Sequence, residues 1–214
     1  MNHLYEEPQL TLDGKIKIMQ DFTTCYQNAS GQSPAMREAK CLRVQYPAVM
    51  GPIHPEDYFA GRVGGLPIGF SPQPECMELG YYLDEAELKR LQQQCETEAQ
   101  RAALLRLRDY WREHKTVNRI TALYDEPLLE ALPNKHYVYD RAPAYPLYRL
   151  SGSQLDYGRL LKIGADGWRA ELRQRAQSSE PSKADFYAAL ILALDVYTDT
   201  CLRYREQAPQ EACT

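Results

Sequence analysis

Apolar residues recur at steps of three and four along most of this chain, which is the spacing of one face of an α-helix. The pattern is clearest over residues 155–176, where charged residues fall mostly on the other faces. Gly164 and Gly167 lie inside this predicted helix although each costs about 1 kcal/mol relative to alanine. We expect both glycines to allow close packing against another backbone. The predicted apolar face consists of Tyr157, Leu160, Leu161, Gly164, Trp168 and Leu172.

The last predicted helix spans residues 183–207 and carries an apolar stripe of the same spacing. Because a short turn separates it from the preceding helix, we expect the two to pack as antiparallel neighbours. In that arrangement the Trp168 and Leu172 side chains are buried against the last helix. Their expected partners there are Leu190 and Leu194. We interpret the whole stripe as core; it consists of Phe186, Leu190, Leu194, Tyr197, Cys201 and Tyr204.

Two further helices are predicted in the first quarter of the chain. The first spans about residues 13–28 and is followed by Gly31, which breaks the pattern. Ser33 and Pro34 form an N-cap followed by proline at the first helical position, and the helix that they start is predicted to end before Pro47. The inner face of the first helix is predicted to consist of Ile16, Met19, Phe22, Thr23 and Tyr26.

The longest predicted helix begins after Asp84, which forms a loose capping pattern with Glu87, and runs to about residue 114. Its first half is polar nearly all round, so we interpret it as a surface helix with a buried C-terminal half. Thr116 begins another helix, which Pro127 interrupts. The apolar residues of the buried half are Leu104, Leu107, Tyr110 and Trp111.

Irregular segments separate these helices. Residues 1–12 are predicted to be a loose arm, and residues 47–83 form a proline-rich extended connection with short strands near residues 59–63 and 68–70. A connection of this length is usually functional or packed on a partner. The fold class is therefore mainly α with one long irregular connection, and strands are expected chiefly in residues 44–75 and in the loop 133–154.

Composition narrows the class of protein. The 214 residues carry a net charge of −4, which disfavours a nucleic-acid-binding surface, and no apolar run reaches the about 18 residues that a membrane-spanning helix needs. The N-terminus carries Glu6 and Glu7 and no basic-apolar pattern, so we expect no secretory leader. The six cysteines and four histidines show no redox or zinc spacing, so we expect reduced thiols, no metal site and a cytoplasmic location.

The run LDYGRLLKIGADGW, residues 155–168, resembles a segment of the glycyl radical enzymes, the superfamily of pyruvate formate-lyase and the glycyl radical dehydratases. In that family an Asp-Tyr pair, a basic-apolar pair and a Lys-x-Gly open a helix after a loop. The resemblance extends to Arg-Ala-Pro at residues 141–143, to HPEDYFAGR at residues 54–62 and to residues 183–208, so it covers most of the chain. The matching residues, in order, are Asp156, Tyr157, Arg159, Leu160, Leu161, Lys162 and Gly164.

The resemblance implies that residues 1–214 form one region at the N-terminal side of an α/β barrel, where they supply its helical outer layer. The family's reaction needs a cysteine that becomes a thiyl radical and a glycine that stores the radical in an Arg-Val-x-Gly-aromatic loop. Arg62-Val63-Gly64-Gly65-Leu66 imitates that loop, but it lacks the aromatic residue and most of the chain follows it. Cys76 has the dehydratases' Cys-x-Glu spacing, but far too early in the chain. We therefore assign no catalytic residue and no cofactor to this chain; the family's glycyl radical is installed by an S-adenosylmethionine-dependent activating enzyme.

The resemblance also implies a wall of a substrate pocket in the loop before residue 156. In the dehydratase branch a histidine follows this Arg-Ala-Pro sequence, and here Tyr145 takes its place after Arg141. Alignment from the downstream Asp-Tyr pair instead places Gly152 or Ser153 there. In the pyruvate formate-lyase branch an arginine of this loop holds the substrate carboxylate, which a guanidinium matches with two donors; Arg149 is the nearest candidate, and the alternative is an ordinary surface arginine. The candidate substrate-binding residues are Arg149, Tyr145, Ser153 and Arg141.

The sequence thus predicts the N-terminal segment of a glycyl radical lyase or dehydratase that cleaves a C–C or C–X bond of a small organic substrate. We expect the segment to be inactive by itself and to need the remainder of the barrel, or a second polypeptide that carries it, together with the activating enzyme. The alternative is a stand-alone helical remnant or a partner-binding protein without catalysis. The sequence contains no catalytic triad or phosphate-binding loop that would support an independent hydrolase or transferase.

Overall fold

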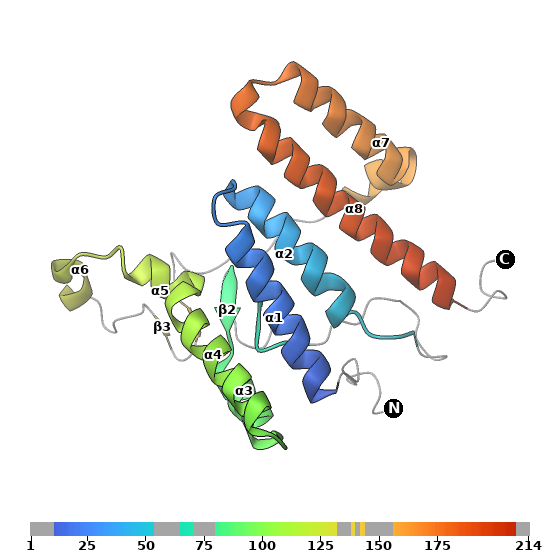
Figure 1. The fold of residues 1–214 in the computed structure, drawn as a ribbon. Coiled ribbons are helices and arrows are strands. Elements are labelled where there is room, and N and C mark those ends of the chain that lie inside the picture. Colours follow the sequence, from blue (N-terminus) through green and yellow to red (C-terminus); the bar gives the residue numbers. More distant parts are fainter. Residues whose placement is uncertain are drawn as a thin grey trace. The chain divides into compact units, whose positions relative to one another are not determined.

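The computed structural model confirms a mainly α-helical chain (Figure 1). It describes residues 11–53, 65–70, 80–131, 138–139, 142–143 and 156–208. The chain divides into two compact units, which are treated separately below. The first unit comprises Met1–Gln9, Asp21–Gly64 and Gln154–Thr214. The second unit comprises Leu10–Gln20 and Gly65–Ser153.

Helix α1 spans Leu12–Asn28 and is the one helix that contributes to both units. All five residues of its predicted inner face are buried, which confirms the helical period read from the sequence. Within the first unit the Arg37 guanidinium carbon of the next helix lies 5.0 Å from the centre of the Tyr26 ring, a cation–π contact between the two helices.

Helix α2 spans Pro34–Val49 and starts as predicted, with the Ser33 hydroxyl accepting a hydrogen bond from the Met36 amide. The prediction that it ends before Pro47 is wrong, because the helix continues through this residue. Pro47 stands in the last turn, where its missing N–H removes a single helical hydrogen bond. Helix α8 also supports this end: the Arg203 guanidinium donates to the Pro47 carbonyl, and the Tyr204 hydroxyl donates to a carbonyl two residues beyond the helix.

Helices α7 (Tyr157–Ser178) and α8 (Ala184–Gln207) form an antiparallel hairpin joined by a short 3₁₀ turn at Pro181–Lys183 (Figure 1). Helix α8 packs on α2 and on α7, and its buried residues are Ala189, Leu194, Val196 and Tyr204. The interpretation of its whole predicted stripe as core is wrong, since four members are exposed: Phe186, Leu190, Tyr197 and Cys201.

Helix α7 is kinked at Gly164, whose φ of +65° and ψ of −178° are accessible to glycine and to almost no other residue. A Cβ built on Gly164 meets no atom within 4 Å, so the expectation of close packing at this glycine is wrong and the need is conformational. At Gly167 a Cβ would come within 2.6 Å of the Ile163 Cβ, a side chain of the same helix. Both glycines therefore serve the kink of α7 and not an approach of a second backbone.

The second unit contains two small antiparallel sheets. Strands β1 (Ile68–Phe70) and β2 (Tyr81–Leu83) pair, and so do β3 (Val138–Tyr139) and β4 (Ala142–Pro143). β1, β3 and β4 fall in the regions predicted to hold strands, whereas β2 lies beyond residue 75. The sequence did not predict β2, because this strand lies at the end of the long proline-rich connection.

The helix predicted from Asp84 to about residue 114 is two helices, α3 (Glu85–Gln93) and α4 (Glu98–His114). The Asp84 carboxylate caps α3 as predicted by accepting from the Glu87 amide at 2.9 Å. The break arises because Thr97 and Gln100 form a complete capping box, which starts a new helix in the polar stretch.

The core of the second unit is centred on Trp111, whose side chain is fully buried and stacks on Tyr81 with ring centres 5.9 Å apart. The Thr116 hydroxyl accepts from the Tyr81 amide at 2.9 Å, which ties the start of α5 (Thr116–Thr121) to β2. After a short turn, α6 (Glu126–Ala131) carries the predicted interrupting proline within its first turn. Other fully buried members of this core are Ile68, Tyr82, Leu88, Leu91 and Leu104.

Candidate functional site

The four substrate-binding candidates from the sequence, Arg141, Tyr145, Arg149 and Ser153, lie outside the described residues. Their assignment therefore stays a prediction. Cys76 also lies outside the described residues. The structure describes the chain again from Asp156 onward, shortly after the segment that contains these four candidates. An open cavity of the first unit begins there.

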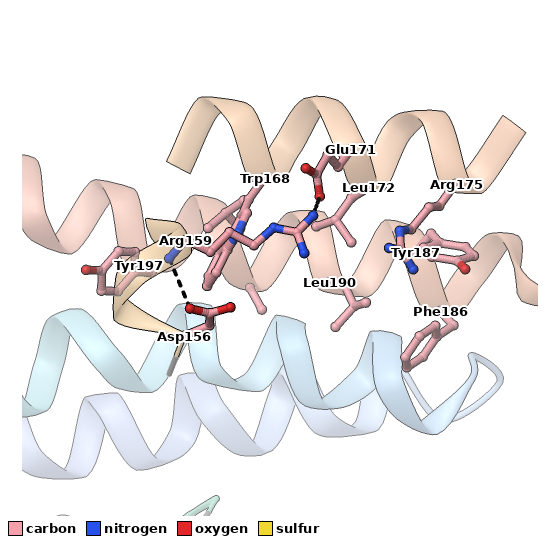
Figure 2. Close-up of a pocket in the computed structure, with 12 residues that line it drawn as sticks. Asp156, Arg159, Trp168, Glu171, Leu172, Arg175, Phe186, Tyr187, Leu190 and Tyr197 are labelled. Atoms are coloured by element: carbon pink, nitrogen blue, oxygen red, sulfur yellow. Dashed lines mark hydrogen bonds and ion pairs between the residues drawn. The ribbon is translucent and has the colours of Figure 1, made fainter. Parts of the chain in front are cut away.

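This cavity is an open groove of about 690 Å³ between α7 and α8, here called the hairpin groove (Figure 2). Its apolar lining comes from the facing sides of the two helices. The expected proximity of Trp168 and Leu172 to Leu190 and Leu194 is confirmed, because all four line the groove. Their expected full burial is wrong: Trp168 and Leu172 are half-buried and Leu190 is exposed.

Charged residues lie at the two ends of the groove. Figure 2 shows Asp156 and Arg159 at one end, and Arg175 with Phe186 and Tyr187 at the other. The kink of α7 makes this layout, since it sets the short segment before Gly164 apart from the long segment that faces α8. A single straight helix would not place the residues at its start beside the middle of its own length.

An ion pair across the kink links the two segments of α7. The Arg159 guanidinium donates to the Glu171 carboxylate, twelve residues further along the helix. This hydrogen bond holds the pKa of Glu171 below its ordinary value and raises that of Arg159. The Asp156 carboxylate caps the helix by accepting from the Arg159 amide at 3.0 Å. The two charges of the Arg159–Glu171 pair thus offset each other at the groove surface.

Arg169 fastens the long segment of α7 to α8. Its guanidinium donates to Asp195 at 2.8 Å and to the Thr198 hydroxyl at 3.3 Å, and it also pairs with Asp166 of its own helix. The Arg169 side chain is only 15% exposed, so these bonds lie in a partly desolvated position. Hydrogen bonding to Asp195 raises the pKa of Arg169, and the guanidinium stays charged at every physiological pH.

Tyr197 forms part of the groove wall beside Cys201. A hydrogen bond to Cys201 raises the Tyr197 pKa most, with further contributions from burial and from Tyr157. The phenol therefore stays protonated at neutral pH and cannot act as a base. The described lining of the groove holds no Cys–His or paired-acid arrangement, and the described part of the chain has no cluster of three His, Cys, Asp or Glu residues for a metal.

The first unit also holds two thiols, Cys25 of α1 and Cys41 of α2, and neither takes part in a disulfide. Burial raises the pKa of Cys25, while a hydrogen bond to Cys41 and the charge of Lys40 act in the opposite direction. A thiol with a raised pKa is mostly protonated at neutral pH and is a poor nucleophile.

Sequence reasoning missed the groove itself and the charged residues at its ends. The available signal was the spacing of Phe186, Leu190, Ala193 and Tyr197, which repeats at helical steps. Helix α8 carries a second apolar face, with Ala189 and Val196, and that face is the one buried in the unit. Periodicity identifies both faces but does not say which of them another element of the unit covers.

Comparison with known proteins gives one family. A family model described as pyruvate formate lyase-like matches residues 1–213. No curated protein matches the chain significantly. Among the helices that the structure describes, none is long and apolar enough to cross a lipid bilayer.

Proposed function

The chain belongs to the pyruvate formate lyase-like family of the glycyl radical enzymes, and from that membership we propose that it acts as the N-terminal segment of a glycyl radical lyase or dehydratase. In this role it contributes helical structure and one wall of the pocket for a small organic substrate. The observation that carries the proposal is the family match over residues 1–213, nearly the whole chain. The mainly helical fold agrees with a segment that lies outside a barrel.

The proposed segment is catalytically inactive by itself, because the sequence has neither the glycine loop nor the catalytic cysteine at the position that the family gives them. Radical storage needs a glycine shielded in a closed core and a cysteine near the substrate. The glycine-rich run that ends in Gly65-Leu66 lacks the aromatic residue of the family loop, and Cys76 stands far too early in the chain. We propose that a longer chain or a second, cytoplasmic polypeptide supplies the barrel, and that a radical-activating enzyme acts on that part.

The test is to treat the purified chain without oxygen with an activating enzyme and S-adenosylmethionine, and to record the electron paramagnetic resonance spectrum. We expect no glycyl doublet from this chain, and a doublet once a polypeptide that carries the barrel is added. A doublet from the chain by itself would contradict the proposal. A Gly65→Ala variant would then show whether Gly65 holds the radical, since alanine at that position removes the glycyl signal.

The substrate pocket is proposed to use Arg149 as the partner of a substrate carboxylate, with Tyr145, Ser153 and Arg141 nearby. In the assembled enzyme, Arg149→Lys is expected to raise KM for a carboxylate substrate by about tenfold, because a lysine loses the two-pronged hydrogen bonding. An Arg173→Lys variant, an exposed residue of α7, is the matched control. Equal KM values for both variants would show that Arg149 is an ordinary surface residue and does not hold the substrate.

A second candidate function is a partner-binding protein without catalysis. The observation in its favour is the concentration of exposed large apolar side chains on the α7–α8 hairpin. The neighbouring open reading frame distinguishes the two. A downstream frame that encodes a barrel with the cysteine and glycine loops supports the enzyme segment, and a downstream frame without them supports the binding protein.

A further inference from the structure

Two cysteine side chains meet between α1 and α2 in the first unit. The Cys25 thiol of α1 is hydrogen-bonded to the Cys41 thiol of α2, and neither takes part in a disulfide. The same two helices also touch through the Arg37 guanidinium and the Tyr26 ring. Tyr26 directly follows Cys25, and Arg37 lies about one helical turn before Cys41. The two helices therefore hold two sulfur atoms side by side.

This arrangement suits a disulfide. A disulfide spans Cα atoms about 4.4–6.8 Å apart, and helices packed with their axes about 8–10 Å apart bring facing residues into that range. Residues 26–40 separate the two cysteines, so the bond would close a short loop that contains the turn between the helices. We therefore expect the bond to form by rotation of the two side chains, with both helices in place.

The two thiols differ in their access to solvent. Cys25 is half-buried and lines an open hollow of about 350 Å³, which Asp21 and Lys40 also line. Because Lys40 directly precedes Cys41, the hollow independently places this part of α2 beside Cys25. The Cys41 side chain is fully buried. A small oxidant such as hydrogen peroxide therefore reaches Cys25 through the hollow and does not reach Cys41.

Burial and charge act in opposite directions on Cys25. Burial raises its pKa, the hydrogen bond to Cys41 and the charge of Lys40 lower it, and the net direction is upward. The thiolate is thus a minor species at neutral pH, and its attack on an oxidant is slow. After that attack the second thiol reacts within the same molecule, at a high effective concentration. The pair is therefore suited to lasting oxidative exposure and not to a fast signal.

We propose that Cys25 and Cys41 are an oxidisable dithiol that closes a disulfide between α1 and α2 when the protein meets a peroxide. The Cys25 thiolate attacks one peroxide oxygen and the O–O bond breaks, which gives a sulfenic acid and a hydroxide that takes up a proton. The Cys41 sulfur then attacks the sulfenic sulfur, loses its proton and expels the sulfenic oxygen as water. The two thiols lose two electrons, and the peroxide is reduced to two molecules of water.

The disulfide would restrain a helix that contributes to both units. It joins α1, which both units share, to α2, the helix on which α8 packs. A dithiol reductant such as dithiothreitol reverses the bond by thiol–disulfide exchange. The proposal does not depend on the radical role, because neither Cys25 nor Cys41 is assigned a part in it.

The first test is to treat the folded full chain with hydrogen peroxide, block the remaining thiols and digest with trypsin without a reductant. Cleavage at the lysine and arginine residues between the two cysteines places them in separate peptides, residues 18–37 and 41–43. We expect these peptides to be joined, and the thiol count of the unfolded chain to fall from six by two. Dithiothreitol should separate the peptides and restore the count.

Variants separate the two steps of the reaction. Cys41→Ala should stop it at the sulfenic acid of Cys25, which dimedone then labels. Cys25→Ser should leave Cys41 reduced, because the buried thiol is not reached. Cys201→Ser is the matched control, since it removes an exposed cysteine of the same unit and should leave the yield of the cross-link unchanged. Where Cys41→Ala loses helix by circular dichroism, Cys25→Ser still decides the outcome.

The second test measures what the bond does to the fold. The oxidised chain should unfold at a higher urea concentration than the same chain after dithiothreitol, because the cross-link restricts the unfolded state. This comparison isolates the disulfide, since dithiothreitol leaves methionine sulfoxide as it is. In Cys25→Ser the two midpoints should be equal. A lower midpoint for the oxidised wild type would overturn the proposal, because the bond would then strain the native helices.

Peptides that stay separate after peroxide treatment also overturn it. So does a cross-link that forms only once the chain has been unfolded, since the fold would then not bring the two thiols together. A disulfide that joins other cysteines while Cys25 and Cys41 stay reduced has the same consequence. None of these results bears on the spectroscopic test of the radical role.

Discussion

The two tryptophans of this chain stand in two kinds of structure. Trp111 is fully buried in the second unit, stacked on Tyr81 and surrounded by residues of the same unit. Trp168 lies half-buried in the hairpin groove, whose lining includes exposed Leu190. Both helices have the same apolar period, so the period does not decide burial. What differs is that β2 covers the apolar face of α4 within its unit, whereas part of the apolar face of α8 stays open.

The largest expected effect is at Trp111. Trp111→Ala should lower the free energy of unfolding by about 3–5 kcal/mol, because it removes a fully buried ring and leaves a cavity. Urea denaturation followed by far-ultraviolet circular dichroism measures it. A loss below about 1 kcal/mol would mean that the core of the second unit is not closed, and the contrast between the two regions would fail.

Gly164→Ala tests the kink that shapes the groove. A side chain at φ +65° and ψ −178° is strained, so we expect a loss of about 1–3 kcal/mol or a straightened α7. Gly31→Ala is the control, since a Cβ at either position meets no atom within 4 Å but Gly31 has no positive φ. Equal unfolding free energies for the two variants would show that α7 does not need its kink.

Trp168→Ala should cost about 1–2 kcal/mol, since the side chain is only partly buried. The same denaturation measures this loss. A loss as large as that of Trp111→Ala would mean that the groove is closed in solution, and the two regions would then be alike.

The smallest effect concerns two carboxylates, one in each region. In the second unit the Arg112 guanidinium donates to Glu85 at 3.1 and 2.5 Å and holds its pKa below the ordinary 4.5. In the hairpin Arg159 does the same to Glu171. Because each folded pKa lies below the unfolded one, each pair stabilises the protein above about pH 4.5, and this contribution is lost as the pH falls through the folded pKa.

Unfolding free energies of the wild type, Glu85→Gln and Glu171→Gln between about pH 3 and 6 test this prediction. Both variants should flatten the acid loss slightly, since both carboxylates are partly exposed. The two flattenings should be similar in size, as the two pairs are similarly exposed. An acid loss as steep in the variants as in the wild type would show that other carboxylates govern it.

Local signals predicted much of the fold. The face of α1 from Ile16 to Tyr26 and the start of α2 at Ser33 follow from period and capping, which act over a few residues. The break between α3 and α4 was equally local, since Thr97 and Gln100 are a capping box in plain sequence. The passage of α2 through Pro47 was not local, because Arg203 and Tyr204 of α8 support that helix end from far along the chain.

The site was less predictable than the fold. The stripe of α8 gave the correct neighbours for Trp168, but it did not reveal that Leu190 and Tyr197 would stay exposed. The Arg159–Glu171 pair depends on the kink at Gly164. A glycine in a helical pattern does not by itself predict a positive φ. The exposure of these residues depends on which elements pack over them, and the ion pair depends on backbone geometry. The apolar period of the sequence predicts neither.

The pairing of α2 with α8 has a consequence for the order in which a ribosome completes this protein. The Tyr204 hydroxyl meets the Gly51 carbonyl across 153 residues of sequence, which is on the order of 10 s of synthesis at common elongation rates. During that interval all of the second unit, Leu10–Gln20 and Gly65–Ser153, has left the ribosome, while α2 still lacks the helix that covers it. The second unit can therefore fold first, and the first unit is completed only when the last part of the chain emerges.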